Sequence, residues 1–172
     1  MQREALLLSV RPIFANRIME GIKTAELRRV RPGVSPGQAV LIYSSSPTMA
    51  LLGSAAVERV EAAAPSALWP RVRHAAGVSE AEYLGYFAGA TSAAAIWLSN
   101  VVPLTEPIPL PELRRRWPWF RPPQSYCFVR AHVDPPNRTV ESMAPRCEGD
   151  SVDLGRADRT RLPRQPQRHC SW

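Results

Sequence analysis

Short apolar runs alternate with turn residues along the first 130 positions, and their periods predict strands and helices in succession. Residues 5–10 form a largely apolar run of strand length, after which Pro12 begins a helix with one apolar face. Gly21 lies where a glycine commonly ends a helix. Polar and apolar residues alternate over 24–30, and a buried strand is predicted over 39–43.

The following segments continue the mixture of strands and short helices. Residues 50–60 are long for one flat strand, so we expect a bulge or bend at Gly53. Two short helices are expected between 65 and 88, then a strand over 92–102, a helical turn over 112–117 and a last strand over 125–129. About six short strands with inserted helices predict an α+β fold, a small mixed β-barrel.

The periodicity disappears after residue 134. The remaining residues, 135–172, are rich in arginine and proline and carry only scattered apolar side chains. Such a composition is typical of a segment that cannot bury enough apolar surface to fold. We therefore expect one domain over residues 1–134 and a disordered arginine- and proline-rich tail over 135–172.

Length and composition restrict the class of protein. The chain has 172 residues and a formal net charge of +7, which suits one domain and favours a polyanionic partner. No apolar run is long enough for a membrane span, and residues 1–4 lack the pattern of a signal peptide, so we expect a cytoplasmic protein. Cys127, Cys147 and Cys170 are widely spaced, which predicts reduced thiols, no bound metal and no cofactor.

Lys23 is the only lysine, whereas the other 21 of the 22 basic residues are arginines. An ammonium group whose pKa changes on burial cannot be replaced by a guanidinium that stays charged. Glu26 and Arg28 lie two residues apart on the strand predicted next, so both side chains point to the same face. The candidate ligand residues of this stretch are Gly21, Lys23, Thr24, Glu26, Arg28 and Arg29.

The stretch from Gly21 to Arg28 has the form G-x-K-T-x-E-x-R and resembles the motif of ASCH domains, in the PUA-like superfamily. Residues 8–15 resemble the first strand and helix of that family, and 36–43 resemble its next strand. Residues 122–126 are similar to the proline-glutamine segment of many bacterial members. The resemblance implies a PUA-like β-barrel whose cleft, lined by the lysine, acid and arginine, binds RNA, a nucleotide or a modified nucleoside, in translation or gene regulation.

A hydrolase of the same fold is the alternative. Some relatives are amidohydrolases that act on acylated cytidine, and others look like ribonucleases. The threonine proposed as nucleophile in the amidohydrolases is replaced here by Glu26. Lys23 and Glu26 could still act as a general acid and base, if burial moved their pKa values toward neutrality.

Further candidates lie outside the motif. Tyr43 and Trp117 could stack on bases, and Arg114 and Arg115 could meet phosphates. Tyr86 is expected in the core. Residues 114–119 could alternatively form a surface for a protein partner.

Overall fold

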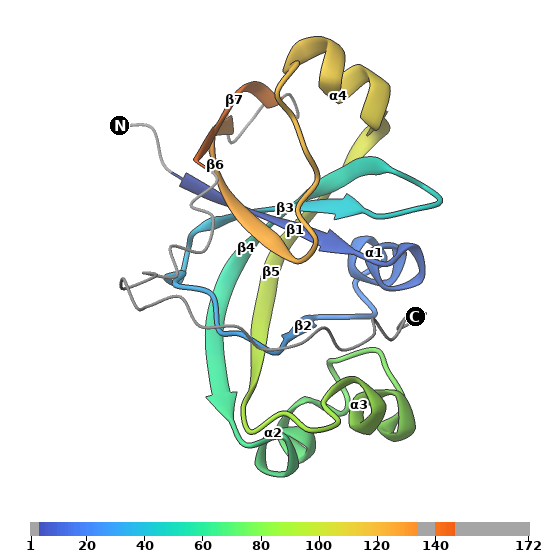
Figure 1. Cartoon of the computed structure of the whole chain (residues 1–172), viewed down its shortest axis with the longest axis vertical. Coiled ribbons are helices and arrows are strands. Elements are labelled where there is room, and N and C mark those ends of the chain that lie inside the picture. Colours follow the sequence, from blue (N-terminus) through green and yellow to red (C-terminus); the bar gives the residue numbers. More distant parts are fainter. Residues whose placement is uncertain (1–3, 134–139, 147–172) are drawn as a thin grey trace, which may run out of the picture.

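The computed structural model describes residues 4–133 and 140–146, which form seven strands and four helices (Figure 1). The strands are β1 Glu4–Val10, β2 Ala25–Arg28, β3 Ala39–Ser44, β4 Ala50–Ala63, β5 Ala93–Pro109, β6 Tyr126–Val133 and β7 Val140–Arg146. The helices are α1 Pro12–Met19, α2 Pro65–Val72, α3 Glu80–Tyr86 and α4 Leu110–Arg116. The fold is therefore α+β, as the sequence predicts. None of the described helices is long and apolar enough to span a membrane.

The strands form one open sheet in the order β2-β5-β4-β3-β1-β6-β7. Only β1 and β3 pair in parallel, and every other described pair is antiparallel. The expected closed β-barrel is wrong, because no described pairing joins the edge strands β2 and β7. The short β2 pairs with one end of β5, whereas β6 and β7 are added beyond β1, so the two edges do not meet.

Local residue chemistry explains the two long strands at the centre. The β3–β4 pairing shifts register opposite Gly53, so the expected bulge is confirmed. We expected the strand that starts near residue 92 to stop at 102, but β5 continues to Pro109. β2 pairs with residues 94–97 of β5, and Leu98 N also donates to Thr24 O. Beyond Leu98 no described strand pairs with that edge, and edge positions are where a strand tolerates proline.

The last described strand lies beyond residue 134, where we predicted the domain to end, and the division into domain and tail stays a prediction. β7 lies inside the segment that we expected to be disordered, and it pairs with β6 in antiparallel register. The sequence of β7 has no clear alternation, so its pairing with β6 could not be recognised locally. The rest of the predicted tail, 134–139 and 147–172, lies outside the described residues, and so do Cys147 and Cys170.

Three apolar clusters hold the helices to the sheet. One joins α4 to β1, β3 and β6, a second packs α1 on the central strands, and a third packs α2 and α3 against the far ends of β4 and β5 (Figure 1). Ser79 caps α3, since its hydroxyl accepts from Glu82 N and the Glu82 carboxylate accepts from Ser79 N. The α2–α3 part and the α4 part thus lie at opposite ends of the molecule.

Candidate functional site: a cleft with a buried ionic floor

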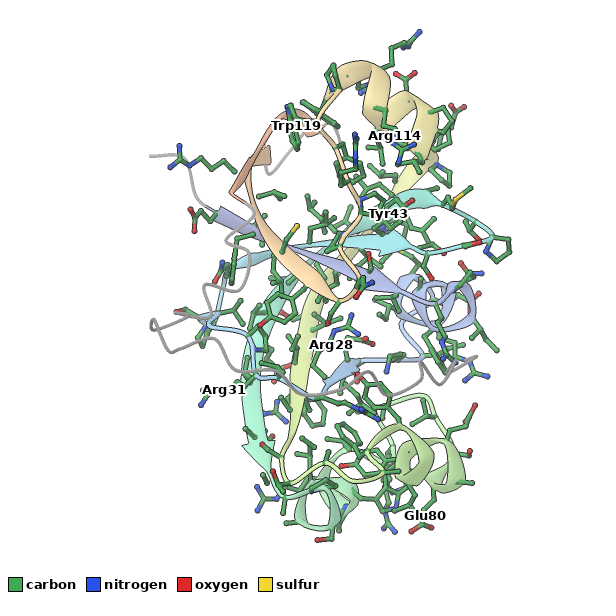
Figure 2. All side chains as sticks on the ribbon, in the orientation of Figure 1. Arg28, Arg31, Tyr43, Glu80, Arg114 and Trp119 are labelled. Carbon is green, nitrogen blue, oxygen red and sulfur yellow. The ribbon has the colours of Figure 1, made fainter. Side chains whose placement is uncertain are left out.

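A cleft of about 1120 Å³ opens between these two parts. One wall comes from α3, and the other comes from the start of α1, the ends of β1 and β3, α4 and residues 122–125. Strand β2 forms the floor. In Figure 2, Arg28 lies midway along the molecule, with Tyr43 and Arg114 on the α4 side and Glu80 in the α2–α3 part.

Lys23 is the first residue of the floor, and it is only 2% exposed. Its ammonium donates to the carbonyls of Ala25, at 2.8 Å, and Ala76, and lies 3.3 Å from Glu26 Oε2. An ammonium has three N–H donors, so these three acceptors use all of them. Gly77 packs against the stem of the lysine, because a Cβ there would lie 3.0 Å from Lys23 Cβ.

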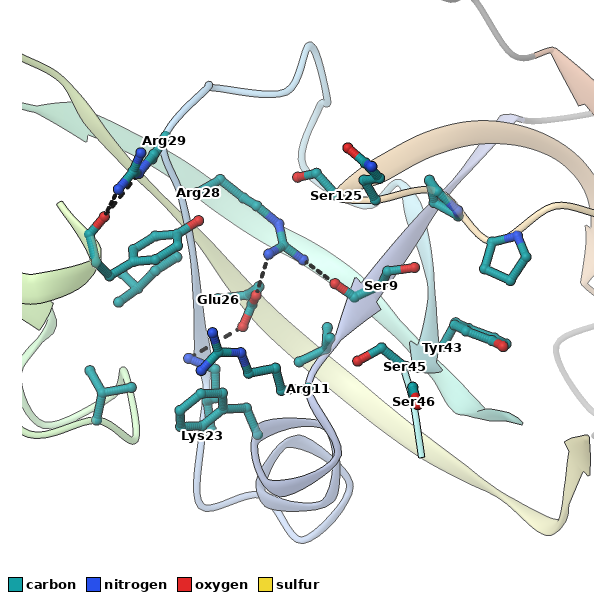
Figure 3. Close-up of a pocket in the computed structure, with 18 of the residues that line it drawn as sticks. Ser9, Arg11, Lys23, Glu26, Arg28, Arg29, Tyr43, Ser45, Ser46 and Ser125 are labelled. Atoms are coloured by element: carbon teal, nitrogen blue, oxygen red, sulfur yellow. Dashed lines mark hydrogen bonds and ion pairs between the residues drawn. The ribbon is translucent and has the colours of Figure 1, made fainter. Parts of the chain in front are cut away.

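Glu26 and Arg28 continue the floor toward β1. Arg28 Nη1 lies 2.9 Å from Glu26 Oε1, and Arg28 Nη2 donates to the carbonyl of Ser9 at 3.0 Å (Figure 3). Both side chains are buried, and the carboxylate is shared between one cation on each side. This row of contacts runs from Lys23 through Glu26 and Arg28 to the carbonyl of Ser9. It therefore joins the segment after α1 to the end of β1.

Burial lowers the pKa of Lys23 below its usual value of 10.5, although the neighbouring Glu26 carboxylate acts in the opposite direction. The loss of hydration penalises the charged ammonium by more than the ion pair restores. The nearby Arg28 and Arg17 guanidinium groups lower the pKa further. The network thus compensates the buried charge of the lysine only in part.

The edge of the cleft carries two arginines, Arg11 and Arg114, which we call the rim cations. Unlike the floor residues, they have no ionic partner among the described residues. Arg11 and Arg114 line the cleft, and within the described residues neither guanidinium makes an ion pair or hydrogen bond. Hydroxyl groups of Tyr43, Ser45 and Ser125 line the same wall (Figure 3). Burial raises the pKa of Tyr43 above its usual 10.0, so this phenol is neutral and can donate a hydrogen bond near pH 7.

The opposite wall holds an arginine and a tyrosine in contact. Arg29 Nε and Nη2 both donate to the carbonyl of Tyr86, and the guanidinium carbon lies 5.4 Å from the centre of the Tyr86 ring. We expected Tyr86 in the core, but this ring is 40% exposed and lines the cleft.

Six of the ten candidate residues line this one cleft: Lys23, Glu26, Arg28, Arg29, Tyr43 and Arg114. Trp117 is not among the residues that line the cleft, and it packs in the α4 cluster. Arg115 lies outside the cleft and pairs with Glu112 at 2.7 Å.

Gly21 and Thr24 also lie outside the cleft. Gly21 has a φ of +75°, which fits a glycine in the turn after α1. Thr24 contributes backbone bonds, since its N–H donates to Ala75 O and its carbonyl accepts from Leu98 N. These two residues shape the approach to β2.

Sequence reasoning missed Arg11, Ser9, Ser45 and Ser125 as part of the site. The positions of Arg11, Ser9 and Ser45 in the chain could have indicated the site, since all three lie at or just after the carboxyl ends of β1 and β3. These strands are parallel neighbours, so their carboxyl ends meet at one edge of the sheet. Recognising it required knowledge of the strand order. Within the described residues, no three His, Cys, Asp or Glu side chains lie together in a way that could hold a metal ion.

Residues 8–107 match the model of the ASCH domain. This chain belongs to the ASCH domain family. A protein of Zymomonas mobilis named "ASCH domain-containing ribonuclease" is 34% identical over 128 residues, which cover 74% of this chain and 86% of that protein. The family assignment suggested by the G-x-K-T-x-E-x-R stretch is therefore confirmed.

Solved structures agree with this assignment. The crystal structure of ASCH from Zymomonas mobilis has a TM-score of 0.70 and 33% identity, covering 73% of this chain and 87% of that one. Two mutant structures of ASCH from the same organism also have TM-scores of 0.70. In one a tyrosine is replaced by phenylalanine, at 33% identity over 74% of this chain and 91% of that one. In the other a serine is replaced by alanine, at 32% identity over 75% of this chain and 90% of that one.

Proposed function

We propose that this ASCH domain protein binds RNA in the cleft and cleaves its phosphodiester backbone. The observation that carries the proposal is the cleft rim, where Arg11 and Arg114 lack protein partners among the described residues and where Arg114 lies close enough to the neutral phenol of Tyr43 to act on its pKa. Cations of this kind bind phosphate and stabilise the charge that develops on it during cleavage. The ribonuclease name of the relative from Zymomonas mobilis supports the same reaction.

Each group of the rim has a role in this proposal. In cleavage the ribose 2′ oxygen bonds to phosphorus and releases its proton to water, while the bond from phosphorus to the 5′ oxygen breaks. Arg11 and Arg114 hold the phosphate, and Tyr43 donates a proton or hydrogen bond to the departing 5′ oxygen. Ser125, on the same wall, orients the RNA strand. The relative's mutant structures replace a tyrosine and a serine, and Tyr43 and Ser125 are the residues we propose to compare with them.

In this proposal Lys23 and Glu26 position the site and do not react. All three ammonium donors of Lys23 are engaged, so it would act as a base only after leaving its partners. Both Glu26 oxygens face cations. The hypothesis that these two residues form the catalytic pair of a hydrolase stays a prediction, which the geometry favours less.

Binding of RNA or a nucleotide without cleavage is the second candidate. It is favoured by one observation: the cleft-lining carboxylates, Glu26 and Glu82, are both engaged, the latter in the Ser79 cap. Neither is free to take a proton from a ribose hydroxyl. In that case the same rim would hold the strand and nothing would be cleaved.

A cleavage assay on the full chain separates the two candidates. Labelled single-stranded RNA and DNA of the same sequence are incubated with the wild type, Tyr43→Phe and, as a matched surface control, Arg71→Ala. We expect cleavage of RNA alone, unchanged in the control and reduced about a hundredfold or more in Tyr43→Phe, because that change removes the proton donor. RNA that is bound but never cleaved would leave only the binding role. RNA that is neither bound nor cleaved would reject both.

A further inference from the structure

The α3 wall of the cleft presents a flat aromatic surface. Tyr86 is the last residue of α3, and its ring is 40% exposed where it lines the cleft. The ring packs edge-on against Phe87, with centroids 4.8 Å apart and planes at 74°. Phe87 itself is buried, so this contact fixes the orientation of the exposed ring.

Arg29 also contacts this ring. Two of its N–H groups converge on the Tyr86 carbonyl, one of the last carbonyls of α3, where a cation is also favoured by the helix dipole. Its guanidinium lies against the Tyr86 ring, at 5.4 Å from the ring centre. With two of its five donors engaged in this way, Arg29 is held as a planar group beside the ring.

The two walls therefore differ in what they can recognise. The α4-side wall offers the cations of Arg11 and Arg114 and several hydroxyl groups, which suit phosphate and ribose. The α3 wall offers the planar pair of Arg29 and Tyr86, which suits the face of a base. In Figure 3, Arg29 lies on one side of the ionic floor and Tyr43 and Ser45 lie on the other.

We propose that Tyr86, held by Arg29, forms a subsite on which one unpaired nucleobase of the RNA stacks. This inference rests on the proposed binding of RNA in the cleft. Aromatic side chains and guanidinium planes both stack on unpaired bases, whereas a base in a duplex has its faces covered by neighbours. The subsite thus recognises the base face, and the rim recognises the backbone.

Two substitutions at Tyr86 isolate the aromatic ring. Tyr86→Phe keeps the ring and removes only the hydroxyl, whereas Tyr86→Leu keeps an apolar side chain against Phe87 and removes the planar surface. Trp119→Ala is the matched control, because Trp119 is also exposed, at 39%, and does not line the cleft (Figure 2). Thermal unfolding of each variant checks that the fold is retained.

The probe is a short single-stranded RNA with 2′-O-methyl groups, which block cleavage, together with a series in which one base at a time is deleted. In the wild type we expect one deletion to weaken binding by roughly 5- to 150-fold, the range typical of one stacked base. Tyr86→Leu should bind the intact RNA more weakly by the same factor. Deleting the same base should not weaken the affinity of this variant any further. Tyr86→Phe and Trp119→Ala should behave as the wild type.

The outcomes separate this inference from the proposed function. If the wild type binds the RNA and Tyr86→Leu keeps both its affinity and its response to base deletion, the subsite is wrong while RNA binding stands. If Tyr86→Phe is as weak as Tyr86→Leu, the ring is not the recognition element and the inference is also wrong. If the wild type binds no RNA, the proposed function and the subsite fail together.

Discussion

The floor and the rim of the cleft use the same residue types in opposite ways. In the floor, Lys23, Glu26 and Arg28 are at most 9% exposed and bonded to one another and to backbone carbonyls. On the rim, Arg11 and Arg114 line the cleft without an ionic partner among the described residues. Cations that are buried and ion-paired hold the structure, and cations without a partner are available to a ligand.

This difference changes the meaning of the motif that reveals the family. The G-x-K-T-x-E-x-R stretch forms the foundation of the cleft, since it fastens β2 to the loop at Ala76 and to the end of β1. The α3 wall follows that loop directly. We therefore expect substitutions in the motif to reduce stability first and RNA binding as a consequence.

The largest effect is expected for Glu26→Gln. Removal of the carboxylate charge leaves Lys23 and Arg28 buried without compensation, and breaking a buried ion pair from one side costs about 3–5 kcal/mol. Urea denaturation should show this decrease in the free energy of unfolding. Glu112→Gln is the control, because Glu112 pairs with two arginines on the exposed surface and should barely change the midpoint.

Lys23→Arg should have the next largest effect. The guanidinium is larger than the ammonium, and Gly77 leaves no room beside the stem of the side chain. Forcing a larger group into a packed site costs about 1–3 kcal/mol, so the variant should unfold at lower urea than the wild type. A variant as stable as the wild type would show that the floor requires charge alone.

The pH dependence of stability should show the incomplete compensation of Lys23. Because the pKa of Lys23 is lowered on folding, the unfolded chain binds more protons between the folded pKa and 10.5, and the contribution of Lys23 to stability rises with pH across that window. Its unfavourable contribution is complete below the folded pKa and disappears as pH approaches 10.5. The difference in unfolding free energy between wild type and Lys23→Met should therefore grow in favour of the wild type as pH is raised. A constant difference would contradict the lowered pKa.

The sequence predicted the floor well because its members are close neighbours. Lys23, Glu26 and Arg28 lie on or just before one short strand, so spacing and alternation alone bring them together. The same local reasoning located the bulge at Gly53.

The rim could not be predicted in this way, because residues far apart in the chain assemble it. Ser45 follows β3 and Ser125 precedes β6, and only the strand order brings them to one wall. The sequence also did not show which aromatic side chains would be exposed. Trp117 and Tyr86 are both aromatic residues near helix ends, yet the first is buried and the second faces the cleft, which depends on tertiary packing.

The salt dependence of RNA binding tests the contrast between floor and rim most directly. The dissociation constant of uncleavable single-stranded RNA is measured over a range of salt for the wild type, Arg11→Ala/Arg114→Ala and the exposed control pair Arg71→Ala/Arg73→Ala. Removing one arginine that binds a phosphate should reduce the slope of log affinity against log salt by about 0.7. We predict that reduction for each rim arginine and no change in the control pair. An unchanged slope in the rim variant would contradict the assignment of the rim as the surface that binds RNA.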